Sequence, residues 1–181
     1  YCAMLLAEVF DKAGVPNGVF NIVNGYGPTV GAALSEHPDV AMMSFTGSTR
    51  AGIAVAQASA SSVKRVHQEL GGKSPNIILD DVPDLEKSVK GGAGHCFLNS
   101  GQSCNAPTKM LVSSKNYDKA VEIAAATANS TTVGDPNGEF RLGPIANKVQ
   151  YEKILKLIER GIEEGATLVA GGVEKPDGCD K

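Results

Sequence analysis

The chain has 181 residues, of which 42% are hydrophobic and 20% are charged, and its net charge is -3. This composition is typical of a soluble globular protein, and the charge gives no electrostatic reason to expect nucleic acid or a membrane surface as a partner. No apolar run approaches the length that a membrane span needs. The four cysteines show no CxxC spacing, so we expect no metal site and a reducing compartment, the cytoplasm.

Helix and strand patterns alternate along residues 1–70. An opening apolar helix is expected to end near Gly14, where a turn begins. The alternation then predicts strands at 19–23, 40–45 and 63–70 and helices at 29–35 and 49–59. Strands that alternate with helices favour a parallel α/β sheet.

The pattern resumes after Gly71-Gly72, where we place the boundary between two domains, 1–70 and 71–181. Here the spacing predicts strands at 77–79, 109–112 and 167–170 and helices at 84–98, 117–128 and 149–164. The chain opens inside a helical pattern and stops in a polar loop. We therefore expect an internal segment of a longer protein.

Two motifs hold residues capable of joint chemistry. Glu69 opens the string Glu69-Leu70-Gly71-Gly72-Lys73-Ser74-Pro75, and Cys104 closes the string Phe97-Leu98-Asn99-Ser100-Gly101-Gln102-Ser103-Cys104. A sulfur nucleophile and a carboxylate base can form a thioester and then hydrolyse it. A cysteine thiol needs help from its surroundings to ionise at neutral pH, and partial burial would make the glutamate a better base.

A third motif, Phe45-Thr46-Gly47-Ser48-Thr49, joins a predicted strand to a predicted helix. Free backbone amides and the helix dipole favour an anion at such a turn. Gly-Ser is also a common N-cap pair, so the motif alone leaves both interpretations open. No GxGxxG string is present.

These three strings resemble the active-site signatures of the aldehyde dehydrogenase superfamily, and a weaker resemblance runs nearly end to end. It implies a Rossmann-like parallel sheet followed by part of a second α/β domain. Residues 1–70 would be the C-terminal part of the NAD(P)-binding domain, and residues 71–181 the N-terminal part of the catalytic domain. The parent protein would be a homo-oligomer, a dimer or tetramer.

The resemblance also implies the reaction and its residues. An aldehyde would be oxidised to a carboxylic acid with NAD or NADP, through a thiohemiacetal and a thioester on Cys104. Glu69 would activate the water that hydrolyses the thioester. The expected cofactor-binding residues cluster in three short segments: Gly25, Gly27, Phe45, Thr46, Gly47, Ser48, Leu70 and Gly71.

Other interpretations stay open. Cys104 could be a buried structural cysteine, and Glu69 could cap a helix or pair with Lys73. The whole could be a non-catalytic family member that serves as a binding or structural piece, or a CoA-acylating relative. The family's upstream oxyanion asparagine and downstream glutamate-phenylalanine motif have no counterpart in residues 1–181. The segment alone is therefore expected to be inactive.

Overall fold

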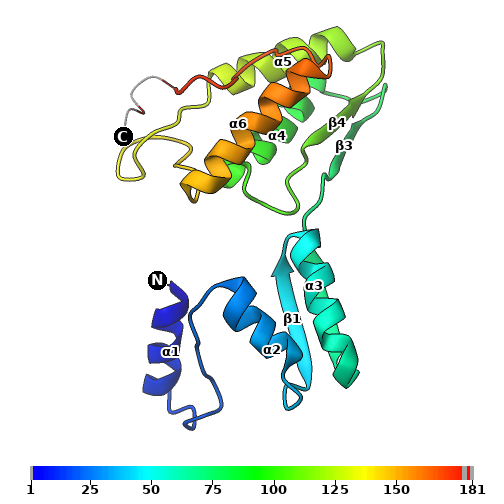
Figure 1. Cartoon of the computed structure of the whole chain (residues 1–181). Helices are drawn as coiled ribbons and strands as arrows, with labels where there is room; N and C mark the ends of the chain where they lie inside the picture. The colour runs from blue at the N-terminus through cyan, green and yellow to red at the C-terminus, as the bar shows by residue number, and fades with distance from the viewer. Residues whose placement is uncertain (1, 177–178, 180–181) are drawn as a thin grey trace. The chain divides into compact units, whose positions relative to one another are not determined.

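The computed structural model describes residues 2–176 and 179. The chain divides into two compact units, Tyr1–Gly71 (unit 1) and Gly72–Lys181 (unit 2). Each unit holds one two-stranded parallel sheet with helices beside it (Figure 1). The predicted fold class, α/β with parallel strands, is confirmed.

Unit 1 contains a βαβ crossover, in which helix α3 connects the parallel strands β1 and β2. Strand β1 and strand β2 pair in parallel, from Met42↔Arg65 to Gly47↔Leu70. Its elements in chain order are α1 (Cys2–Lys12), the π-helical turn η1 (Gly27–Gly31), α2 (Ala32–Glu36), β1 (Met42–Gly47), α3 (Thr49–Ser59), the 3-10 turn η2 (Ala60–Ser62) and β2 (Arg65–Leu70).

Helix α3 lies close to β2 because Gly52 has no side chain. A Cβ built at Gly52 would lie 2.7 Å from Leu70 Cδ2. The Gln68 Nε2 also donates to the Gly52 carbonyl at 2.5 Å. These contacts turn Gln68 and Leu70 toward α3, and the alternation of a strand turns their neighbours the other way.

Unit 2 contains the hydrophobic core. Strands β3 and β4 pair in parallel, and buried Ile78, Val89, Ala120 and Ile123 join the sheet to helices α4 and α5. Its elements are β3 (Pro75–Ile78), α4 (Leu85–Phe97), the 3-10 turn η3 (Leu98–Gly101), β4 (Lys109–Val112), α5 (Tyr117–Asn129) and α6 (Lys148–Glu163). Asp84 and Asn147 cap α4 and α6, each accepting a hydrogen bond from a backbone amide three residues on.

The predicted helices at 49–59, 84–98, 117–128 and 149–164 are confirmed as α3 to α6, with ends that differ by at most one residue. Two predicted strands are wrong: residues 19–23 and 167–170 are irregular. A strand exists only when its backbone groups pair with a neighbour. Both segments expose apolar side chains, among them Val19 (70% exposed) and Val23 (69%).

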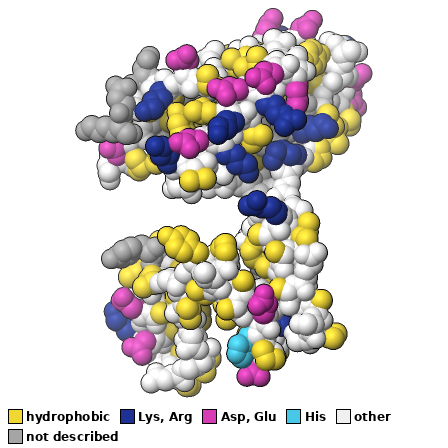
Figure 2. Space-filling view, in the orientation of Figure 1, with side chains coloured by type: hydrophobic (Ala, Val, Ile, Leu, Met, Phe, Trp, Pro, Cys, Tyr) yellow, Lys and Arg dark blue, Asp and Glu magenta, His cyan; other side chains and the backbone are white. Residues whose placement is uncertain are grey.

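Apolar side chains are visible on the surface of both units (Figure 2). On the helices they include Val9, Ile53 and Leu157, each more than half exposed. No helix within residues 2–176 and 179 is long and apolar enough to cross a membrane.

Candidate active site

The predicted cofactor motif and the predicted base meet at one edge of the unit 1 sheet. Thr46 is the register partner of Glu69, and Gly47 is the partner of Leu70. Because β1 and β2 are parallel, these four residues lie at the carboxyl ends of adjacent strands. In open α/β sheets this edge is where ligands bind.

The backbone at this edge is open at Gly71 and covered at Gly47. Gly47 lies under the ring of Phe45, and a Cβ there would be 2.5 Å from Phe45 Cζ. Around Gly71 no heavy atom comes within 4 Å of such a Cβ, and the residue is exposed. The main chain at Gly71 can therefore be approached closely by a flat group, whereas the Phe45 ring fills the side-chain position of Gly47.

Ser48 begins α3 as its N-cap. Its hydroxyl accepts a hydrogen bond from the Ala51 amide at 3.3 Å. Ser48 therefore caps the helix, which is one of the two interpretations of the Gly-Ser pair. The 11-residue helix still directs the positive end of its dipole at the carboxyl edge of β1, and that dipole favours an anion there.

Gly25 and Gly27 lie on the loop that leads into η1 and α2. Gly25 lies against Val30 so closely that a Cβ would overlap the Val30 methyl group. Gly27 is the first residue of η1, and Pro28 follows it. In Figure 1 the chain enters α2 at the same end of unit 1 at which β1 ends.

Glu69 is exposed, which corrects the expected partial burial. Side chains along β2 alternate: those of Val66, Gln68 and Leu70 are half-buried, while that of Glu69 is on the opposite face. Unit 1 therefore leaves the carboxylate in solvent. Glu69 and Cys104 belong to different units, so their juxtaposition stays a prediction.

Cys104 is a free, exposed thiol in a tight turn of unit 2, so it is not the buried structural cysteine of the alternative interpretation. The Ala106 amide donates to the Ser103 carbonyl at 3.2 Å and closes the turn around Cys104. Ala106 is buried and anchors the turn to the unit. Gly72 lies against the Cys104 main chain, since a Cβ at Gly72 would be 3.5 Å from the Cys104 carbonyl oxygen.

The residues before the cysteine adopt left-handed backbone conformations. Asn99 has φ 54° and Ser100 has φ 56°, and Gly101 follows with φ 73°. A left-handed conformation costs an ordinary residue roughly 1–2 kcal/mol, although asparagine tolerates it better. Ser100 is thus the strained position of this loop.

Two side chains of this loop bond to a distant segment. The Ser100 hydroxyl donates to the Gly143 carbonyl at 2.7 Å. The Ala146 amide donates to Gln102 Oε1 at 2.8 Å. The sequence alone does not reveal these contacts, because the bonded residues are 43 and 44 positions apart.

Cys96 differs from Cys104 in its surroundings. It lies half-buried on α4, and this burial raises the pKa of its thiol. A raised pKa keeps the thiol protonated and unreactive at neutral pH. Cys96 is therefore suited to packing.

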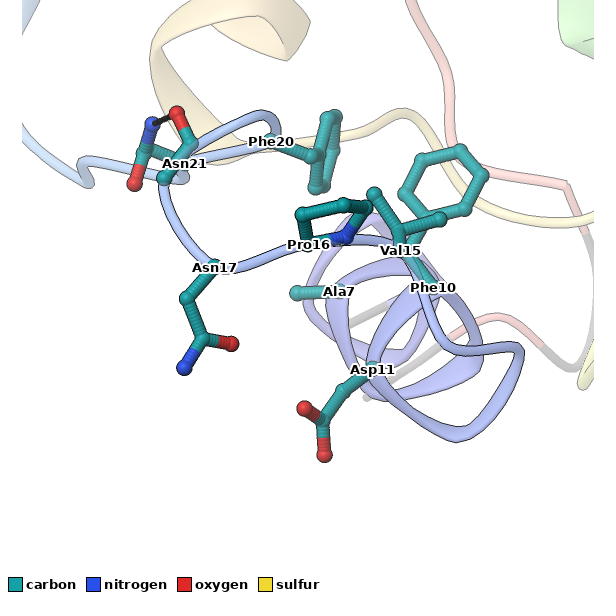
Figure 3. Close-up of a pocket in the computed structure, with 9 residues that line it drawn as sticks. Ala7, Phe10, Asp11, Val15, Pro16, Asn17, Phe20 and Asn21 are labelled. Carbon is teal, nitrogen blue, oxygen red and sulfur yellow. Dashed lines mark hydrogen bonds between the residues drawn. The ribbon is translucent and has the colours of Figure 1, made fainter.

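A pocket in unit 1 lies between α1 and the loop that follows it (Figure 3). Phe10 and Phe20 meet there edge to face, with ring centroids 4.6 Å apart. None of the predicted site residues lines it. Within residues 2–176 and 179, no group of three or more His, Cys, Asp or Glu side chains could hold a metal ion.

Comparison with known proteins identifies the family. Residues 1–181 match the aldehyde dehydrogenase family over their whole length. The chain belongs to the aldehyde dehydrogenase family. Among curated aldehyde dehydrogenase relatives, 3-succinoylsemialdehyde-pyridine dehydrogenase from Pseudomonas sp is 52% identical over 181 residues, covering 99% of this chain and 38% of the relative. A putative aldehyde dehydrogenase from Staphylococcus aureus (strain USA300) is 46% identical, covering 100% of this chain and 38% of the relative.

Solved aldehyde dehydrogenase structures share the fold. A cysteine-to-alanine mutant of aldehyde dehydrogenase C from Pseudomonas syringae, in complex with NAD+ and octanal, superposes with a TM-score of 0.95 at 51% identity. The match covers 97% of this chain and 36% of that one. The enzyme from Bartonella henselae gives a TM-score of 0.95 at 50% identity, over 99% of this chain and 37% of that one. The chain thus spans 38% of the length of its curated relatives.

Proposed function

We propose that the full-length form of this protein oxidises an aldehyde to a carboxylic acid with NAD or NADP. The observation that carries the proposal is the family match along all of residues 1–181, which include both Glu69 and Cys104. The solved relative that holds NAD+ and octanal, in a mutant lacking one cysteine, supports the same cofactor and substrate class.

The carboxyl edge of β1 and β2 fits a dinucleotide. The start of α3 at Gly47-Ser48 would receive the pyrophosphate, with the helix dipole facing its charge. The open backbone at Gly71 would lie along the cofactor, beside Leu70. Phe45 and Thr46 would complete this wall, and Gly25 and Gly27 would contribute the loop before α2. When bound, the nicotinamide would supply the hydride acceptor of the reaction.

Cys104 would carry the covalent steps. Its thiolate adds to the aldehyde carbon, and the carbonyl oxygen takes a proton, which gives a thiohemiacetal. Loss of hydride from that carbon and of the hydroxyl proton leaves a thioester on the sulfur. Cys104 is exposed on the turn 103–106, where its sulfur is accessible to such a substrate, and the main chain of Cys104 lies beside Gly72.

Glu69 would complete the cycle as the base. It takes a proton from water, the oxygen attacks the thioester carbon, and the Cys104 sulfur leaves with the acid released. Glu69 is the register partner of Thr46, at the carboxyl edge of the unit 1 sheet where the cofactor would bind.

We infer that residues 1–70 belong to the cofactor domain and residues 71–181 to the catalytic domain. The division into compact units between Gly71 and Gly72 supports this assignment. The separation also agrees with the proposed roles, since the cofactor wall lies in unit 1 and the nucleophile in unit 2.

The test is aldehyde oxidation by the full-length protein, with octanal and NAD+ or NADP+ as the reagents. We expect Cys104→Ala to lower NADH formation to background, because no thiohemiacetal can form. The matched control is Cys2→Ala, which removes another exposed free thiol. It should keep the activity of the unmodified protein.

Unchanged turnover in Cys104→Ala would overturn the nucleophile assignment. A full-length protein inactive with a panel of aldehydes and both cofactors would favour the non-catalytic family member. Turnover that depends on added coenzyme A would favour the acylating alternative, in which the thioester passes to a thiol.

A further inference from the structure

We propose that residues 143–146 act as a clamp on the loop 99–103 and thereby position Cys104 for reaction. Ser100 and Gln102 are the positioning residues through which the clamp acts. The inference rests on the proposed role of Cys104 as nucleophile. It adds a functional segment about forty residues beyond the motif, where Ser100 and Gly143 meet.

The loop needs a clamp because its backbone is strained. Asn99, Ser100 and Gly101 adopt left-handed conformations, and two residues separate Gly101 from the proposed nucleophile Cys104. Local bonds hold part of it, since the Gln102 amide and Nε2 both donate to the Asn99 carbonyl, at 3.1 and 3.0 Å. These local bonds would move with the loop and cannot fix its position relative to the unit.

The clamp supplies the fixed points. One bond reaches each end of the segment 143–146: Ser100 Oγ to the Gly143 carbonyl, and the Ala146 amide to Gln102 Oε1. Pro144 lies between them and restricts the backbone of the segment. The two bonds hold both residues that flank Gly101.

The clamp is itself anchored on both sides. Before it, the Leu142 amide donates to the Thr132 carbonyl and the Gly134 amide donates to the Leu142 carbonyl, both at 3.0 Å. After it, Asn147 caps α6 through the Gln150 amide. Because the segment 143–146 is held at both ends, its position is fixed before the loop binds to it. Its two hydrogen bonds can therefore fix the position of the loop 99–103 relative to unit 2.

The experiment compares Ser100→Ala with Ser100→Gly in the full-length protein. Alanine loses the hydroxyl and keeps the left-handed strain, whereas glycine loses the hydroxyl and relieves the strain. We measure the rate at which iodoacetamide alkylates Cys104, with the modified peptide identified by mass spectrometry. This readout needs neither aldehyde nor cofactor. The burst of NADH is measured in parallel.

We expect Ser100→Ala to slow both alkylation of Cys104 and the NADH burst by about three- to ten-fold, the effect of losing one partly buried hydrogen bond. Ser100→Gly should return both rates to within about two-fold of the unmodified protein. The matched control is Ser130→Ala, because the Ser130 hydroxyl also donates to a backbone carbonyl, that of Thr127, at the end of α5. It should change neither rate.

Equal alkylation rates in Ser100→Ala and the unmodified protein would overturn the clamp. So would a Ser100→Gly protein as slow as Ser100→Ala, because the strain would then have no role. If alkylation follows the expected order while the unmodified protein oxidises no aldehyde, the clamp stands and the proposed function fails. If Cys104→Ala abolishes aldehyde oxidation but Ser100→Ala changes nothing, the proposed function stands and the clamp fails.

Discussion

The side-chain alternation of β2 decides what Glu69 can face. Gln68 and Leu70 turn toward α3, so Glu69 lies on the other face of the strand, in solvent. We propose that this carboxylate serves as the base for thioester hydrolysis and has no part in the addition of the thiol.

This division of roles makes a prediction for Glu69→Gln. The amide keeps the shape of the side chain but cannot accept the proton, so thioester hydrolysis should slow by about 10² to 10⁴-fold. Rapid-mixing kinetics of the full-length protein should show a burst of NADH close to one per active site, followed by slow turnover.

Glu36→Gln is the control, since Glu36 is an exposed carboxylate at the end of α2 in the same unit. It should leave both phases intact. A loss of the burst together with the steady state in Glu69→Gln would show that the carboxylate also acts before the thioester forms.

Among the elements, α4 carries the closest helix-to-sheet packing of unit 2. Gly92 faces the sheet, and a Cβ there would overlap the Asn76 amide and lie 3.1 Å from Met110 Cε. Gly91 is exposed, with no heavy atom within 4 Å of such a Cβ. Close packing against the sheet explains the glycine at position 92. No neighbouring atom requires a glycine at position 91.

Gly91→Ala and Gly92→Ala form a matched pair on this helix. Alanine gains about 1 kcal/mol over glycine in a helix interior, so Gly91→Ala should raise the apparent Tm of the full-length protein. Gly92→Ala gains the same propensity, but overpacking typically costs about 1–3 kcal/mol. Its Tm should lie below that of Gly91→Ala. Equal Tm values in differential scanning calorimetry would show that Asn76 moves aside freely.

For the whole molecule, the two sheets are small for the apolar surface around them. Each has two parallel strands, and parallel sheets in proteins are usually larger and covered on both faces. Val19, Val23 and Leu157 remain exposed among many apolar side chains. Large exposed apolar surfaces mark contacts with other protein.

Residues 1–181 expressed alone should therefore behave differently from the full-length protein. We expect strong fluorescence with a dye that binds apolar surface and no NADH formation from octanal and NAD+. The full-length protein measured at the same concentration is the reference. Weak dye binding together with aldehyde oxidation by residues 1–181 would contradict this expectation.

Local patterns of the sequence predicted most of the fold. The spacing of apolar residues predicted the helices α3 to α6. Asp84 and Asn147 precede two of these helices, and their side-chain oxygens accept hydrogen bonds from backbone amides of the first turn. The strands 19–23 and 167–170 were wrong because composition records a preference for strand and says nothing about the partner that a strand requires.

The candidate site was predicted less evenly. The motif between β1 and α3 lies at the carboxyl edge of a parallel sheet, as its order along the chain indicated. The exposure of Glu69 was missed, because burial depends on which face of β2 its neighbours cover. The bonds of Ser100 and Gln102 were also missed, since one sequence does not show that residues 100 and 143 meet.

The loop 134–141 is closed at its base by the bridge between Val133 and Leu142 and is filled by Phe140, whose ring packs on Gly134 and Gly138. Such a self-contained loop can be lengthened, shortened or fitted with a fluorescent label while its two stems stay in place. Changes at the tip of the loop should leave the Val133–Leu142 bridge in place, which makes this loop a suitable site for engineering a reporter into the protein.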